Sequence, residues 1–326
     1  MLKLPFAKSV AMLSALVLAA CPIAILAQDY PSRPVKILVP YAAGGGADAL
    51  ARAIGQRLSE SMGQAFVIEN KPGAGGIAAS DFVAKSPADG YTMLLTDTQF
   101  VISPALFAKL PYDPRKDFRG VSLMTQVPLF IAVKTSENIG TLNDLIALVK
   151  ANPGKFSYGS AGVGSLHHIA MESFKNSLGL DITHVPYKGS GQSVQGFLSG
   201  DVKMLIASFP SVLPHVKAGT VKLLAASSLA RLPEAADVPA ISEVIPGFDY
   251  ATEIGMLVPA GTPPAIVNKL STHIANALKD PETVRRVKEG MGAIPVGSTS
   301  EAYTRNLESN LERYAKAVKI SGAKVE

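Results

Sequence analysis

One short segment, from Val35 to Ala51, limits what this chain can fold into more than any other. A β-branched, apolar run ends at Pro40, three consecutive glycines follow at Gly44 to Gly46, and an apolar–polar helical pattern opens at Asp48. This order predicts a strand, a glycine turn and a helix N-terminus, which together present backbone N–H groups to an anion. Because the segment follows an export signal, we expect it to capture a small carboxylate outside the cytoplasm.

The first 27 residues have the pattern of a secretory signal peptide. Lys3 and Lys8 form a basic n-region, and Val10 to Ala20 is an apolar h-region that is too short to favour a membrane span. We therefore expect cleavage after Ala27 and a periplasmic protein. A second interpretation stays open, because the residues that end in Cys21 also fit the pattern before a lipid-modified cysteine.

The composition excludes several classes of protein. Cys21 is the only cysteine, so the mature chain has neither a disulfide framework nor a thiolate metal site. Without Lys3 and Lys8 it carries 29 basic and 26 acidic residues, a net charge of about +3. No arginine-rich block occurs, so we expect no nucleic-acid partner, whereas a mild positive field favours anions.

Short apolar runs alternate with helical patterns along the chain, which predicts an α/β protein. The predicted strands are 35–39, 65–69, 91–96, 120–125, 129–133, 156–158, 182–185, 203–208, 222–226 and 255–258. The predicted helices are 48–62, 76–85, 141–151, 165–178, 190–198, 212–218, 264–278, 281–290 and 299–320.

The unit of strand, glycine turn and helix occurs a second time, at 156–178, where Gly159 to Gly164 form the turn. Two such units predict two α/β domains that each offer a helix N-terminus to a shared cleft. The segments around 120–133 and 250–258 are the expected crossings between them. We expect residues 28–127 and 254–326 to form domain 1 and residues 128–253 to form domain 2, because the helical tail has no strands for a third sheet.

The first glycine turn also satisfies a dinucleotide-binding fingerprint at Gly44 to Ala49, with Glu69 near the place of a ribose-binding acid. Against a dehydrogenase, the residues from Pro40 to Ala43 separate the strand from the first glycine. The second glycine turn has no role in such a fold, and an exported protein meets little nicotinamide cofactor. We therefore expect no cofactor.

Hydrolase and metal signatures are weaker still. No G-x-S-x-G elbow occurs, and the five histidines include no H-E-x-x-H pair. His167 and His168 are neighbours on a predicted helix and point in different directions, so they cannot share a metal without distortion. We expect no metal and no catalytic residue. One buried and one solvated histidine is the simpler interpretation, and a place for His168 in the cleft stays open.

Many ordered blocks resemble one known family, among them QDYPSRPVKILVPYAAGGGAD, VIENKPGAGG, PADGYTML, LPYDPRKDF, ANPGKFSYGSAG, THVPYKGSG, FPSVLPHVKAG, LPEAADVPAISE and VPAGTP. From Gln28 almost to the C-terminus, the chain is similar to the substrate-binding proteins of tripartite tricarboxylate transporters, the Bug-type receptors. The resemblance implies a type II periplasmic binding fold, a clamshell of two α/β domains around a central cleft, without catalytic activity. It also implies membrane transporter subunits or a sensor kinase as partners, and we expect a monomer.

In that family, the loop after the first strand and the glycine loop of the second domain hold a ligand carboxylate. The resemblance places these loops at Tyr41 to Asp48 and at Ser160 to Ser165. The candidate ligand-binding residues are Tyr41, Ala43, Gly44, Gly45, Gly46, Asp48, Asp97, Thr98, Ser160, Ala161, Gly162, Val163, Gly164, His168, Phe209 and Glu253.

Several of these candidates have a simpler structural interpretation. Asp48 suits a helix N-cap better than a ligand contact, since an unpaired carboxylate would repel the ligand. Tyr41 either covers the ligand or packs on its own loop. Asp97 and Thr98 either line the cleft or form a turn, and Phe209 belongs either to the core or to a lid.

Glu253 marks a departure from the family, because many relatives have an aromatic residue in this segment. It is either solvated at the rim of the cleft, which is the default for glutamate, or it faces the cleft and favours a ligand with amine or hydroxyl donors. The alternative function is a periplasmic α/β enzyme that acts on a small acid. Equilibrium binding without turnover separates the two functions.

Overall fold

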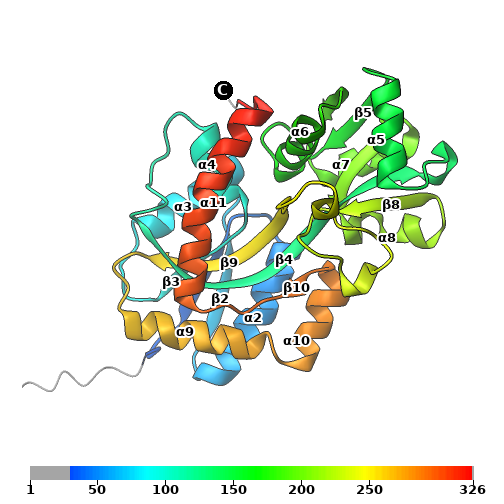
Figure 1. Ribbon diagram of the computed structural model, residues 1–326. Helices are drawn as coiled ribbons and strands as arrows, with labels where there is room; N and C mark the ends of the chain where they lie inside the picture. Colours follow the sequence, from blue (N-terminus) through cyan, green and yellow to red (C-terminus); the bar gives the residue numbers. More distant parts are fainter. Residues whose placement is uncertain (1–29, 325–326) are drawn as a thin grey trace, which may run out of the picture.

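The computed structural model describes residues 30–324, and in this part of the chain ten strands form one continuous sheet (Figure 1). The order along the sheet is β2-β1-β3-β9-β4-β7-β5-β6, and β8 and β10 both pair with β4. The predicted signal peptide and Cys21 lie outside the described residues. The strands are β1 Val35–Val39, β2 Phe66–Asn70, β3 Thr92–Thr96, β4 Phe118–Lys134, β5 Phe156–Ser160, β6 Ile182–Pro186, β7 Met204–Ser208, β8 Val221–Ala226, β9 Ala251–Pro259 and β10 Ile294–Pro295.

Helices cover both faces of this sheet, which confirms the predicted α/β class. The α-helices are α2 Gly46–Met62, α3 Ile77–Ala84, α4 Gln99–Leu106, α5 Leu142–Ala151, α6 Leu166–Leu178, α7 Ser190–Ser199, α8 Phe209–Lys217, α9 Pro264–Ala277, α10 Pro281–Arg285 and α11 Ser300–Ser321. Shorter helical turns are η2 Ala74–Gly76, η3 Thr135–Glu137, η4 Pro233–Ala235, η5 Ile241–Glu243 and η6 Arg286–Gly290.

We call the part of the sheet from β2 to β9, with the first half of β4, the first lobe. Here β1 runs parallel to β2 and β3, and its side chains alternate between two cores. Val35, Ile37 and Val39 pack in the core that also holds the buried face of α2 and α9. Leu38 points to the other face, toward the core shared by α3, α4 and α11.

The second lobe holds the second half of β4 with β5, β6, β7 and β8. Its central strand β5 runs parallel to β6 and β7, so the turn after β5 opens at the same kind of sheet edge as the turn after β1. Helices α5 and α6 cover one face, and α7 and α8 cover the other. In Figure 1 this lobe lies at the upper right, apart from α2, α9 and α10.

One long strand connects the two lobes. β4 pairs with β9 from Phe118 to Pro128, then with β7 and β8 from Leu129 onward. The prediction of two separate strands at 120–125 and 129–133 is therefore wrong. Pro128 lies where β4 leaves β9 for its partners in the second lobe, and the strand continues through it. The assignment of residues 28–127, 254–326 and 128–253 to two domains stays a prediction.

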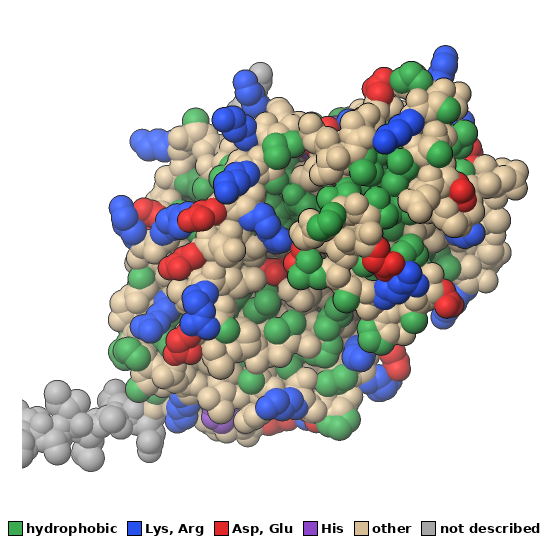
Figure 2. Space-filling model, viewed as in Figure 1, with side chains coloured by type: hydrophobic (Ala, Val, Ile, Leu, Met, Phe, Trp, Pro, Cys, Tyr) green, Lys and Arg blue, Asp and Glu red, His purple; other side chains and the backbone are tan. Residues whose placement is uncertain are grey.

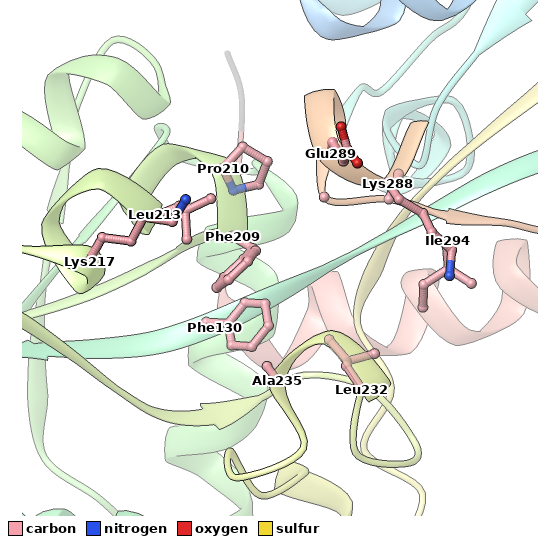
Figure 3. A pocket seen from close by; sticks show the side chains of 12 residues that line it. Phe130, Phe209, Pro210, Leu213, Lys217, Leu232, Ala235, Lys288, Glu289 and Ile294 are labelled. Atoms are coloured by element: carbon pink, nitrogen blue, oxygen red, sulfur yellow. The ribbon is translucent and has the colours of Figure 1, made fainter. Parts of the chain in front are cut away.

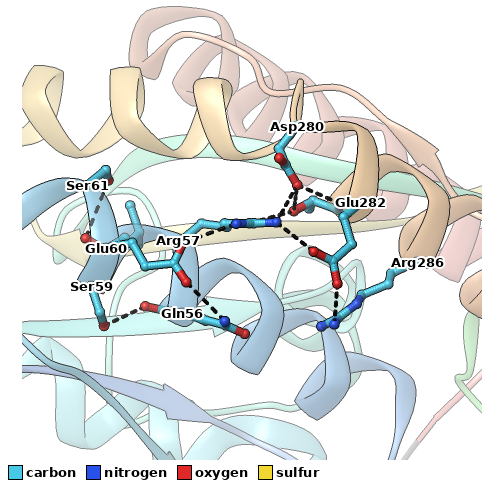
Figure 4. Close-up of polar contacts among 11 residues, drawn as sticks. Gln56, Arg57, Ser59, Glu60, Ser61, Asp280, Glu282 and Arg286 are labelled. Carbon is cyan, nitrogen blue, oxygen red and sulfur yellow. Dashed lines mark hydrogen bonds and ion pairs between the residues drawn. The ribbon is translucent and has the colours of Figure 1, made fainter.

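The tail is mostly helical, as predicted, and its first part is held against α2. Arg57 on α2 binds Asp280 at 2.8 Å and Glu282 at 3.0 Å at the beginning of α10, and it also binds Glu60 (Figure 4). After α10 the helix widens into the π-helical turn η6. These ion pairs attach the segment from α10 to β10 to the first lobe.

The last helix, α11, packs against β4 and α4 of the first lobe and against α6 of the second. Helix α4 was missed by the sequence analysis, because Pro104 inside it conceals the helical pattern. Figure 2 shows Lys, Arg, Asp and Glu side chains scattered over the lobe that carries α11, whereas hydrophobic side chains gather over part of the second lobe.

Candidate functional site

The first glycine loop follows β1 and leads directly into α2. Gly44 has a φ of +89°, a conformation that favours glycine, and Gly45 is the N-cap of α2 without a side-chain cap bond. Gly44, Gly45 and Gly46 are exposed. A helix N-terminus with an exposed glycine cap leaves its first amides open to a ligand.

Asp48 is not the N-cap of α2, which corrects the sequence prediction. It lies in the first turn, is only 3% exposed, and its carboxylate accepts a hydrogen bond from the Gly44 amide at 2.9 Å. Arg52 forms two hydrogen bonds to it, each of 3.0 Å, and the Asn70 amide donates a further one at 2.9 Å. The hydrogen bond from Arg52, followed by that from Gly44, lowers the pKa of Asp48 to about 2. Asp48 therefore fixes the loop, and its charge is neutralised.

Four consecutive amides of this loop, from Gly45 to Asp48, have no hydrogen-bond acceptor among residues 30–324. The next amide along the chain, that of Ala49, is the first to be paired within the helix, and it donates to the Gly45 carbonyl at 2.9 Å. The unpaired donors lie on the partially positive end of the 17-residue helix α2. This end of the first lobe therefore suits an anion.

The second glycine loop follows β5 and leads into α6, as predicted. Gly162 and Gly164 have φ values of +123° and +76°. Ser165 is the N-cap of α6, because its hydroxyl accepts the His168 amide at 3.3 Å. The amides of Ala161 and Val163 have no acceptor in the described part of the chain, and the Val163 side chain is 47% exposed.

Two stacked imidazole rings, those of His168 and His184, form hydrogen bonds that hold this second loop. The rings of His168 and His184 are 4.1 Å apart, and Tyr158 stacks on the other side of His184 at 4.9 Å. His184 Nε2 lies 2.6 Å from the Ser160 hydroxyl, which in turn accepts the Gly162 amide. His168 Nδ1 accepts the Gly164 amide at 3.2 Å, so this nitrogen carries no proton.

Burial explains why these histidines are neutral. Burial, and then the neighbouring His168, lower the pKa of His184 to about 4, and burial lowers the pKa of His168 as well. His168 is 5% exposed and bonded beneath the loop, and His167 is partly buried. The expectation of a solvated neighbour for His168 is therefore wrong.

Tyr41 and Asp97 connect the loops that follow β1 and β3. The Tyr41 hydroxyl donates a hydrogen bond of 2.6 Å to one oxygen of Asp97, and the Gln99 amide donates one of 2.8 Å to the other. Burial raises the pKa of Asp97 and that of Tyr41. Asp97 thus combines the expected turn role with a position beside the first glycine loop.

Glu253 is not solvated at a rim, so that expectation is wrong. It is 7% exposed and accepts hydrogen bonds from the amides of Gln126 at 3.0 Å and Asn310 at 2.7 Å, with a longer one from Asn306. The Thr98 hydroxyl accepts the Glu253 amide and donates to the Ala251 carbonyl. Both residues therefore hold β9, β4, α4 and α11 together.

Phe209 begins α8, and Phe130 is its aromatic neighbour at 5.5 Å. Both rings line a cavity of about 220 Å³ whose opposite wall comes from the segment between η6 and β10 (Figure 3). Phe209 is partly exposed, so it belongs to a cavity wall between the two lobes rather than to a closed core.

The structure thus divides the predicted candidates into four groups. Most belong to the two glycine loops, and Tyr41 and Asp97 form a pair beside the first loop. Thr98 and Glu253 have a structural role, and Phe209 lines the cavity. Sequence reasoning missed Arg52, Asn70 and His184, which hold the loops from neighbouring elements. Arg52 follows Asp48 by one helical turn, a spacing that could have indicated the pair. No pattern in the sequence indicates that β6 places His184 against His168.

The described part of the chain has neither a metal-binding cluster nor a membrane-spanning helix. Among the side chains that the structure describes, no group of three or more His, Cys, Asp or Glu could hold a metal ion. Over the same range, every helix is too short or too polar to cross a membrane.

Known proteins are similar to this chain over nearly its whole length. Residues 50–322 match the tripartite tricarboxylate transporter family receptor. Protein BugT of Bordetella pertussis is 34% identical over 305 residues, which cover 93% of each chain. A UPF0065 protein from the tcbD–tcbE intergenic region of Pseudomonas sp. (strain P51) is 35% identical over 89% of this chain and 86% of its own.

Solved structures agree with this assignment. An R. palustris protein solved with adipate is 35% identical, covers 91% of this chain and 100% of its own, and has a TM-score of 0.78. The periplasmic binding protein BugD is 31% identical with a TM-score of 0.74, over 91% of this chain and 100% of its own. BugD is a periplasmic binding protein, so these likenesses confirm the predicted fold of a periplasmic binding protein. This chain belongs to the receptor family of the tripartite tricarboxylate transporters.

Proposed function

We propose that this protein is an extracytoplasmic receptor that captures a small organic carboxylate through backbone amides of its two glycine loops. The observation that carries the proposal is the pair of unpaired amide sets, from Gly45 to Asp48 in one lobe and at Ala161 and Val163 in the other. The first set lies at the N-terminus of α2, and the second lies in the turn before α6; each of these helices follows the central parallel strand of its lobe. A carboxylate has two oxygens, so it suits donors that approach from two sides.

The surroundings of the first loop favour an anion in spite of two nearby carboxyl groups. Arg52 neutralises Asp48, and the hydroxyl of Tyr41 binds Asp97. Backbone donors need no ordering of a long side chain when the ligand binds. Several charge-assisted hydrogen bonds of about 1.5–3 kcal/mol each are sufficient for micromolar affinity after the cost of association.

The solved relatives support the ligand class. The R. palustris protein was solved with adipate, and a second neighbour, MatC from Rhodopseudomonas palustris, was solved with malate. MatC is 30% identical and covers 89% of this chain, with a TM-score of 0.72. We therefore propose a mono- or dicarboxylate as the ligand, and membrane transporter subunits or a sensor kinase as the partner that receives it.

Calorimetric titration of the purified protein with acetate, propionate, hexanoate, malate and adipate tests this function. We expect saturable binding of at least one acid, and an unchanged acid after overnight incubation. Conversion of the bound acid would favour the alternative, a periplasmic enzyme that acts on a small acid. Failure of every acid to bind would contradict the proposal.

The cellular context is a proposal as well. We propose a periplasmic monomer that is cleaved after Ala27, with residues 28–127 and 254–326 in one domain and 128–253 in the other. Intact mass spectrometry of protein purified from the periplasm tests the cleavage site. A lipid-modified N-terminus at Cys21 would contradict it.

A further inference from the structure

The cavity between the lobes has apolar walls. On the side of the second lobe these are Phe130, Phe209, Pro210, Leu213, Leu232 and Ala235, and on the side of the first lobe they are Gly292, Ala293 and Ile294 (Figure 3). Its volume is about 220 Å³. An apolar cavity of about 150 Å³ in another protein stays dry and binds benzene, so this cavity has room for a group of at least that size.

The cavity also adjoins the elements that carry both glycine loops. A Cβ atom on Gly46 would lie 3.7 Å from the methyl group of Met291, and the next residue, Gly292, lines the cavity. A Cβ atom on Gly292 would lie 2.8 Å from Pro210, so this segment bridges the first loop and the beginning of α8. On the other side, Phe209 directly follows β7, which pairs with β5 before the second loop.

The charges around the cavity do not suit a second carboxylate. Lys217, Lys288 and Glu289 are the charged residues among its lining, and they carry both signs. Lys217 is exposed, and Glu289 lies 3.7 Å from Arg285. An exposed lysine gives a small net gain, whereas a carboxylate among Phe130, Phe209 and Leu213 would lose its hydration without a buried cation.

We propose that this cavity is an apolar subsite of the ligand cleft, so that the ligand is a monocarboxylate whose apolar body has about the size of a benzene ring. The inference rests on the proposed capture of a carboxylate by the two glycine loops. The carboxylate binds the amides, and its hydrocarbon end lies between Phe209 and Ile294. Because the two walls belong to different lobes, filling the cavity with a hydrocarbon favours the closed form.

Three acids and two variants of the full mature protein test this subsite by calorimetry. Hexanoate and adipate have the same number of carbons but differ in one terminal carboxylate, and propionate lacks the distal part. We expect hexanoate to bind at least about 10-fold more tightly than propionate, since each buried methylene adds roughly fourfold in affinity, and more tightly than adipate. In Leu213→Glu, a charge enters the cavity wall and the preference for hexanoate over propionate should fall to about 3-fold or less.

Leu229→Glu is the matched control, because Leu229 is 61% exposed and lies outside the cavity lining. This variant should keep the wild-type preference for hexanoate over propionate. If the added negative charge repels every acid, the affinity for propionate falls as well. Tighter binding of adipate than of hexanoate, or an unchanged preference in a folded Leu213→Glu protein, would overturn the subsite and leave the carboxylate receptor intact. If none of the three acids binds the wild type, the proposed function fails together with the subsite.

Discussion

At the scale of single residues, Asp48 shows how a carboxylate can lie beside the proposed anion site without repelling the anion. Its oxygens are used by Arg52, Asn70 and the Gly44 amide, and it is almost completely buried. The hydrogen bonds from Arg52 and Gly44 keep the pKa of Asp48 at about 2, so it stays ionised at neutral pH. Its role is to hold Gly44 in its left-handed conformation, ahead of the four amides that lack an acceptor within the described residues.

Replacement of Asp48 by asparagine should therefore lower stability more than a simple cap exchange. The asparagine side chain cannot form the ion pair with Arg52, and it has one acceptor oxygen where the aspartate has two. This loss should reduce the free energy of unfolding by about 1–3 kcal/mol at pH 7. Since the folded pKa is depressed, this contribution is present above the unfolded pKa of 3.8 and is lost as the pH falls through about 2. Urea denaturation of both proteins at pH 7 measures the loss, and equal midpoints would contradict this role.

Gly45→Val and Gly162→Val should both weaken carboxylate binding, but they should differ in stability. A Cβ on Gly45 would meet only Ala42 O, at 3.9 Å, so the fold tolerates it while the side chain covers the first loop. Gly162 has a φ of +123°, and its Cβ would lie 3.1 Å from the Tyr187 carbonyl, so valine there is strained. We expect each variant to lose at least about 10-fold in affinity, and only Gly162→Val to melt at a lower temperature. Unchanged affinity in both variants would place the carboxylate elsewhere.

At the scale of elements, the second loop depends on how β5, β6 and α6 pack beneath it. Tyr158, His184 and His168 form one continuous stack. Glu172 on α6 accepts hydrogen bonds from the Tyr158 hydroxyl and from Lys175, and these are the charged groups next to the stack. Two imidazolium rings at 4.1 Å would repel each other, and protonation of His168 Nδ1 would break its bond with Gly164.

The stack predicts that acid weakens both the fold and the second loop. The folded pKa of His184, about 4, is below the unfolded value of 6.5, so the unfolded state binds more protons between these values. The free energy of unfolding should therefore fall as the pH drops from 6.5 to 4, by up to about 3 kcal/mol for this group. Burial also lowers the pKa of His167 to about 4 and that of His168, so His184→Gln should lose only part of this dependence, whereas His215→Gln should keep it. Denaturation curves at both pH values measure the effect, and an identical pH dependence in all three proteins would contradict it.

The elements also show what can be predicted from a sequence such as this. Regular apolar runs located β1, β5 and their glycine turns, because these strands are short and buried. The pairing of one strand with two lobes has no local signal, so two strands, 120–125 and 129–133, were predicted where the structure has β4 alone. Pro104 likewise concealed α4. The contact between His168 and His184 depends on the packing of α6 against β6, which lies beyond any local pattern.

At the scale of the whole molecule, the paired strands β4 and β9 connect the two lobes, and α11 contacts both lobes. A ligand held by loops of both lobes binds the closed form better, and it shifts the equilibrium by that difference in affinity. Small-angle X-ray scattering should therefore give a smaller radius of gyration at saturating ligand. An unchanged radius would indicate a site in one lobe or a form that is already closed.

The central claim is that backbone amides of both loops donate to one carboxylate. Its most direct test is a ¹⁵N-resolved NMR titration of the amides of Gly45, Gly46, Ala161 and Val163 with the acid that binds best. We predict that all four proton resonances move downfield together and saturate with the affinity measured by calorimetry, because a charge-assisted hydrogen bond deshields the donor proton. Saturable binding in which the amide proton resonances of either loop do not shift would contradict the claim.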